Sequence, residues 1–190
     1  PPAAKSREDV LSTFKKQAKR AEKGRMQAIR SSETQIQSTF VPPAYGACVL
    51  PVTELTKMGV DELRLETHHR GRYVLLRALA GPSRMTALVG VGEDEEGRVV
   101  RVQIYQQEDE SDVWKVGGVV VVKEPYFKES GDGDTGIRVD HVGDMMALPA
   151  NHPLVPEKWR KGVDAVLVRG WIDRAAEAMK GKRYWEALDQ

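Results

Sequence analysis

The chain has 190 residues, of which 30% are charged and 41% hydrophobic, and its formal net charge is +1. This length suits one compact domain, or one domain with helical extensions. A single cysteine, Cys48, excludes an internal disulfide framework. Because no apolar run approaches the roughly 20 residues of a membrane span and no signal-peptide pattern is present, we expect a cytoplasmic or nuclear protein and no membrane partner.

Positive charge is concentrated in the first part of the chain. Residues 1–30 hold nine basic side chains and three acidic ones, so the remaining 160 residues carry a net charge of −5. Such an arm can bind nucleic acid or an acidic partner, although a solvated, partly disordered helix is the commoner role of a charged segment. We therefore expect a protein partner and keep nucleic acid as the alternative.

The first predicted element is a helix. Residues 6–9, Ser-Arg-Glu-Asp, are typical of a helix start, because the serine oxygen can accept an orphan amide and the aspartate lies in the first turn. The apolar spacing extends this helix to about Gly24, and a second helical piece is expected from Met26. Prolines 42 and 43 cannot continue a helix, so residues 1–42 are predicted to form a basic helical arm.

Alternating hydrophobicity after Gly71 predicts strands over residues 72–142. Within residues 99–105, Val100, Val102 and Ile104 fall on one face and the residues between them on the other. Two predicted strands flank Gly81-Pro82, and residues 93–97 form a polar turn. The glycines at 90 and 92 indicate a bulge or the sharp coiling that closes a small barrel.

Residues 117–127 are apolar on both faces, which predicts a central strand whose pairing Pro125 ends. Helical signals return after residue 150: Pro156 can start a helix, and residues 163–190 indicate two helices with a turn at Gly181. We expect an α+β fold in which a small, five-stranded OB-like barrel, residues 43–150, is flanked by amino-terminal helices and a carboxy-terminal helical hairpin, residues 151–190. An SH3-like barrel or a sandwich would give a similar pattern.

An aspartate-rich stretch, residues 123–146, could hold a metal or turn a hairpin. Counted from Asp132, a calcium loop would need acidic ligands at its fifth and twelfth positions, which are Gly136 and Gly143. Asp-Gly and Thr-Gly pairs between apolar strands favour the hairpin instead.

Catalytic signals are weak. A metal or hydrolase site could be assembled on paper from six residues, but none has the paired spacing of a specific motif: His68, His69, Asp140, His141, Asp144 and His152. His141 is expected to be packed or hydrogen-bonded. Cys48 lacks a nucleophile signature, and Gly90-Val91-Gly92 is followed by acidic residues that would repel a phosphate. We therefore predict no catalytic, cofactor-binding or metal-binding residue, and a small metal-dependent enzyme is the third hypothesis.

A binding face is better supported. Basic, polar and aromatic side chains from neighbouring strands could stack bases and hold phosphates: Arg101, Gln103, Tyr105, Lys123, Tyr126 and Arg138. The alternative is that the aromatic rings belong to the core and the charges only solvate a face.

Residues 169–190, RGWIDRAAEAMKGKRYWEALDQ, resemble the opening of a tetratricopeptide repeat. Ala175 and Met179 match apolar positions of its first helix, and Tyr184 and Leu188 match the start of its second. Gly170-Trp171 departs from the usual glycine-asparagine. Because one incomplete repeat cannot bury its own face, this resemblance implies a piece of a longer protein.

Residues 61–97, with VQIYQQ, VVVKEPYFK and IRVDHVGDMMAL further on, resemble the amino-terminal region of fungal proteins in which a leading module precedes tetratricopeptide repeats and a SET domain. These proteins are classed with the SET-and-MYND-like lysine methyltransferases. The resemblance implies that the parent protein uses S-adenosylmethionine, while this fragment, which matches no SET motif, serves as a non-catalytic recruitment module. A nucleic-acid-binding module is the alternative.

Overall fold

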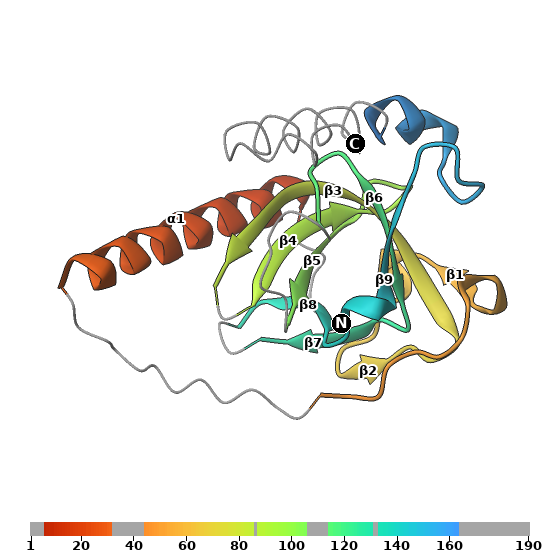
Figure 1. Ribbon diagram of the computed structural model, residues 1–190, viewed down its shortest axis with the longest axis horizontal. Coiled ribbons are helices and arrows are strands. Elements are labelled where there is room, and N and C mark those ends of the chain that lie inside the picture. The colour runs from red at the N-terminus through yellow and green to blue at the C-terminus, as the bar shows by residue number, and fades with distance from the viewer. Residues whose placement is uncertain (1–5, 32–43, 86, 106–113, 131–132, 164–190) are drawn as a thin grey trace, which may run out of the picture.

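The computed structural model describes residues 6–31, 44–85, 87–105, 114–130 and 133–163. Within these ranges one long helix, α1 (Arg7–Ser31), lies along one side of a curled, mixed nine-stranded sheet (Figure 1). The predicted helical hairpin and tetratricopeptide resemblance, from residue 164 onward, lie outside the described residues. Among the described helices, none is long and apolar enough to cross a membrane.

Eight strands follow one another across the sheet in the order β2-β7-β8-β5-β4-β3-β6-β9, and β1 pairs with β3 outside this path. The β1–β3 and β5–β8 pairs are parallel and the others antiparallel. The strands are β1 (Thr56–Met58), β2 (Thr67–His68), β3 (Arg72–Arg84), β4 (Leu88–Glu93), β5 (Val99–Ile104), β6 (Val119–Lys123), β7 (Tyr126–Glu129), β8 (Thr135–Val139) and β9 (Met145–Leu148).

The curled sheet is larger than the five-stranded barrel expected. Its additional strands β1, β2, β7 and β9 have two to four residues each, too few to establish an alternating pattern. The concave side holds the main core, where β3, β4, β5, β6 and β8 contribute apolar side chains around Trp114. The α+β class is therefore confirmed, in the form of a curled mixed sheet with few helices.

Strand β6 is paired on both sides and buried on both faces, as the sequence predicted, but it lies next to the edge strand β9 and not in the middle of the sheet. Val120 and Val122 lie in the main core, whereas Val119 and Val121 face a second apolar cluster with Trp159. All four valines are at most 1% exposed. Trp159 lies in a helical segment, residues 157–163, which follows Pro156 as expected. The sheet is thus covered on both sides at β6.

Helix α1 begins at the predicted cap, where Ser6 Oγ accepts a hydrogen bond from Asp9 N at 3.1 Å. It continues through Gly24 to Ser31 instead of breaking into two pieces. A single helical glycine costs only about 1 kcal/mol relative to alanine, which good helix formers on both sides can offset. Phe14, 4% exposed, anchors the helix against Val89 and Val91 of β4. The basic arm is therefore an ordered part of the fold over residues 7–31.

Gly81-Pro82 is not the turn expected there. Strand β3 runs through this pair, and the register with β4 shifts on both sides of Ala80. The pair therefore lies inside a long strand whose pairing with β4 is irregular at this point. At Gly81, φ is +92°, and a Cβ atom would lie 2.8 Å from Gly90 Cα, so only glycine allows the two strands to approach.

Two predicted polar turns are confirmed. Asp94 N donates to Arg98 O at 2.9 Å between β4 and β5, and the Asp94 carboxylate accepts from Arg98 N at 2.8 Å. In the aspartate-rich stretch, β7 and β8 form the expected antiparallel hairpin, with Ser130 N donating to Asp134 O at 2.8 Å.

Gly90 makes room for the Trp114 indole. A Cβ atom at residue 90 would lie 2.5 Å from Trp114 Nε1, and this indole nitrogen donates to Ala80 O at 3.0 Å. We expect Gly90→Ala to lower the free energy of unfolding by about 2 to 3 kcal/mol, because the buried ring must shift. Urea denaturation measures the loss. Gly143→Ala, where no atom lies within 4 Å of the added carbon, is the control, and equal losses would contradict the packing role of Gly90.

Candidate functional site

Five of the six predicted binding-face residues come together on β5, β7 and β8. Gln103 pairs with Arg138 in the parallel β5–β8 register, and Tyr126 pairs with Arg138 across β7 and β8. Arg101 and Tyr105 flank Gln103 at alternate positions of the same strand and its end. Because paired residues share a face of the sheet, these five side chains lie on the face opposite the main core.

Lys123 lies apart from this group. It is on β6, which β4 and β3 separate from β5. Its Nζ donates to the carbonyl oxygens of Cys48 and Leu50 at 3.3 and 3.4 Å. Lys123 therefore fastens the segment before β1 to the sheet.

The charges of the predicted face are buried and paired. Arg101 is 5% exposed and its Nη1 lies 2.6 Å from Asp134 Oδ2, which also accepts from Gln17 of α1 at 3.0 Å. Arg138 is 3% exposed, and its Nε lies 2.7 Å from Asp140 Oδ1. These pairs join α1, β5 and the β7–β8 hairpin, so a phosphate would have to displace a carboxylate to reach either arginine.

The remaining polar groups of this face also have partners within the fold. The Arg138 guanidinium lies over the Tyr105 ring, 5.1 Å from its centroid. The Gln103 side-chain amide donates to Ser130 Oγ. Tyr126 donates its hydroxyl hydrogen to Glu66 Oε2 at 3.1 Å. The predicted residues thus form a polar layer that connects strands and loops.

An aromatic and histidine cluster lies at the edge of this layer, around Tyr45. The Tyr45 ring centroid is 4.5 Å from that of His68 and 5.6 Å from that of His141. Its hydroxyl donates to Arg138 O at 3.1 Å and accepts from Asp140 N at 3.2 Å. Burial raises the pKa of Tyr45 to about 12, although the Asp140 amide opposes this shift. Tyr45 therefore stays neutral and packs the segment at residues 44–50 onto β8.

His68, His69 and His141 make contacts within the fold. The His141 ring nitrogen Nε2 hydrogen-bonds to Tyr45 O, as expected for a packed residue. His69 Nδ1 lies 3.0 Å from Pro125 O, and its Nε2 accepts from Arg64 N. Burial and the nearby Arg70 lower the pKa of His68. Over the described ranges, no three His, Cys, Asp or Glu side chains are grouped so that they could hold a metal ion.

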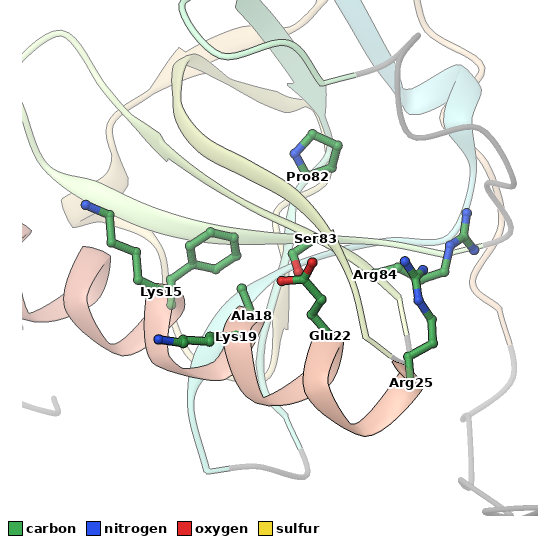
Figure 2. A pocket seen from close by; sticks show the side chains of 9 residues that line it. Lys15, Ala18, Lys19, Glu22, Arg25, Pro82, Ser83 and Arg84 are labelled. Atoms are coloured by element: carbon green, nitrogen blue, oxygen red, sulfur yellow. The ribbon is translucent and has the colours of Figure 1, made fainter. Parts of the chain in front are cut away.

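A groove of about 430 Å³ separates α1 from the end of β3 (Figure 2). Its lining combines four basic side chains, one acidic side chain and a largely uncharged floor: Lys15, Lys19, Arg25, Arg84, Glu22, Phe14, Ala18, Pro82 and Ser83. Figure 2 shows Glu22 and Arg25 extending from α1 toward the part of β3 that carries Ser83 and Arg84. This groove, called the α1–β3 groove below, combines a concave shape with several exposed basic side chains.

Sequence analysis missed this groove. Lys15 and Lys19 are one turn apart on α1, beside the apolar positions Phe14 and Ala18, and this spacing indicates a cationic edge along a packed helix face. The β3 half could not be found in this way, because Ser83 and Arg84 are more than 55 positions further along the chain.

Comparison with family models gives no match. Over 195 aligned residues the chain is 34% identical to a fungal protein from Gibberella zeae named "Methyltransferase". The alignment covers 95% of this chain but only 27% of the relative's length. The chain therefore resembles part of a methyltransferase-related protein, and it spans about a quarter of that relative.

A structural similarity is found to the OB domain of Ta0387 from Thermoplasma acidophilum, solved by NMR. It covers 54% of this chain and 95% of the other, at 14% sequence identity and a TM-score of 0.37. This level of similarity is too low to support an argument about the present fold or its ligands.

Proposed function

We propose that this chain is a non-catalytic binding module that recruits a protein partner to a larger methyltransferase-related protein. The observation that carries the proposal is the extent of the Gibberella zeae match, which includes 95% of this chain and 27% of the relative. Most of the relative's length thus lies outside the matched region and is available for methyl transfer.

The geometry supports a binding role. The arginines of the β5–β8 face are paired with buried carboxylates, and Tyr45 has a raised pKa, so these groups are arranged to hold the fold together. The α1–β3 groove, in contrast, presents exposed lysines beside a preformed concavity. A rigid concave surface with a few converging charged groups is typical of a recognition site.

The finer form of the proposal places S-adenosylmethionine and a SET domain in the rest of the full-length protein, with tetratricopeptide repeats starting near residue 169. It rests on the resemblance of residues 61–97 and 169–190 to fungal proteins of that organisation. Sequencing the gene beyond residue 190 tests it. Repeats followed by a SET domain are expected, and a different methyltransferase domain would overturn the finer form alone.

Nucleic-acid binding is the second candidate. From Lys15 to Arg25, α1 carries six basic residues and one acidic residue. Such a density of positive charge attracts phosphate backbones without regard to sequence. If this candidate holds, binding of a labelled single-stranded RNA should weaken steeply as the salt concentration rises.

Recruitment is tested with the full-length protein and a version that lacks residues 1–163. Both are incubated with the same cell extract and radiolabelled S-adenosylmethionine. We expect the full-length protein to label discrete proteins that the shortened version labels weakly, while both bind the methyl donor equally. An identical labelling pattern, from two proteins with equal donor binding, would overturn the recruitment role.

A further inference from the structure

We infer that the α1–β3 groove binds an acidic segment of a partner protein, with carboxylates flanking an apolar side chain. This inference deepens the proposed recruitment function, since it names the chemistry of the partner. It concerns the groove itself and is tested on the isolated chain, so its failure is distinguishable from failure of recruitment in the full-length protein.

The positive charge of the groove favours an anionic ligand. Lys15, Lys19 and Arg25 line the groove from α1 and are exposed, and Arg84 lines it from β3. Only Glu22 opposes them among the lining residues. Exposed lysine and arginine side chains along one wall of a concavity raise the local concentration of anionic ligands and form charge-assisted hydrogen bonds with carboxylates.

The floor of the groove favours an apolar group on the ligand. The half-buried Ala18 and Pro82 provide the accessible apolar surface of the floor, with Ser83 beside them in the lining, whereas Phe14 is almost fully buried. A purely ionic ligand would leave this surface unused, whereas an apolar side chain could cover it and be excluded from water. The floor therefore favours a peptide that combines acidic and apolar residues.

The groove is preformed because α1 is fixed at several points. Phe14 packs on β4, Gln17 donates to Asp134 at 3.0 Å, and Arg7 Nε lies 3.1 Å from Glu93 Oε2. These contacts position the lysines relative to β3 before a ligand arrives. A rigid site loses less conformational entropy on binding than a flexible arm would.

The surroundings favour a short acidic peptide over nucleic acid. Toward the start of α1, an extended polyanion would come close to Glu8 and Asp9. The acidic turn at residues 93–96 also lies there, because Arg7 pairs with Glu93. Of the described lining residues, the only aromatic ring is that of Phe14, which is 4% exposed and cannot stack on a base. The acidic groups limit the favourable potential at the end of the groove that faces the start of α1.

The test measures fluorescence anisotropy with the 190-residue chain and a fluorescein-labelled Glu-Asp-Leu-Glu-Leu-Asp-Glu peptide. The matched peptide has glutamine and asparagine in place of the acids, and labelled oligouridine and a short DNA duplex represent nucleic acid. We expect the acidic peptide to bind about tenfold more tightly than the neutral one, because carboxylates complement the exposed basic residues of α1 that line the groove.

Two charge-reversed variants locate the site. Lys15→Glu/Lys19→Glu changes the groove, while Lys16→Glu/Lys23→Glu makes the same change of net charge on exposed residues of α1 that do not line it. We expect the groove variant to weaken peptide binding by about tenfold or more and the control variant by less than about threefold, because local pairing outweighs screened long-range attraction. Glu22→Gln is expected to tighten binding. Helical circular dichroism verifies that all variants are folded.

Three outcomes would overturn the inference: no preference for the acidic peptide, equal weakening by the two double variants, or tighter binding of either nucleic acid than of the acidic peptide. Equal weakening would reduce the effect to the net charge of α1. A preference for nucleic acid would instead support the second candidate function.

Discussion

Replacing Val121 by asparagine is expected to lower the free energy of unfolding by about 4 kcal/mol. The two buried methyl groups of the valine are lost, and a polar amide is buried without hydrogen-bond partners. Val121 is fully buried, and β6 lies between β3 and β9 with apolar clusters on both faces. Urea denaturation followed by circular dichroism measures the change.

Val116→Asn is the matched control for this substitution. Val116 is 52% exposed and precedes β6, so the same chemical change should alter the free energy of unfolding by less than about 0.5 kcal/mol. A Val121 variant as stable as the Val116 variant would contradict the assignment of β6 as a strand buried on both faces.

The second large effect is expected at the buried Arg138–Asp140 pair. Asp140→Ala should destabilise the protein by about 3 to 5 kcal/mol, because Arg138 then remains as a buried charge without this carboxylate. The two residues are 3% and 2% exposed, and Asp140 Oδ2 also accepts from Tyr45 N at 3.3 Å. Thermal and urea denaturation report the loss.

Removing both charges separates pairing from simple loss of contacts. The double variant Arg138→Met/Asp140→Leu keeps similar volume without a buried charge, and we expect it to be more stable than Asp140→Ala. If the double variant is the less stable of the two, the side chains act mainly through their other contacts, and the charge-pair explanation is wrong.

The same residues show how far sequence reasoning reached. Alternation correctly divided β5 into a core face with Val102 and a polar face with Arg101 and Gln103. It did not indicate that the polar face is buried. That burial involves α1 and the β7–β8 hairpin, through contacts such as Gln17–Asp134 that join positions 117 residues apart. Local periodicity contains no information about such a covering layer.

For a related reason, the glycine pattern predicted the structure only in part. The sequence indicated that Gly90 marks an unusual place in a strand, and it suggested a bulge or sharp coiling of the sheet. In the structure β4 pairs regularly with β5 at Gly90, and the missing side chain accommodates Trp114. The β3–β4 register does shift beside Gly90, between the pairs Ala80–Val91 and Ser83–Val89, so the irregularity expected there is present on the β3 side. A glycine in a sequence shows where space is needed, but the residue that fills it comes from another part of the chain.

Calorimetric titration of S-adenosylmethionine most directly tests whether recruitment and methyl transfer reside in different parts of the protein. It uses three proteins: this chain, the full-length protein, and the full-length protein without residues 1–163. We predict that the latter two bind the methyl donor with equal affinity and that the chain alone does not bind it. Stoichiometric binding by the chain, or loss of binding when residues 1–163 are removed, would contradict the account of this chain as a non-catalytic recruitment module.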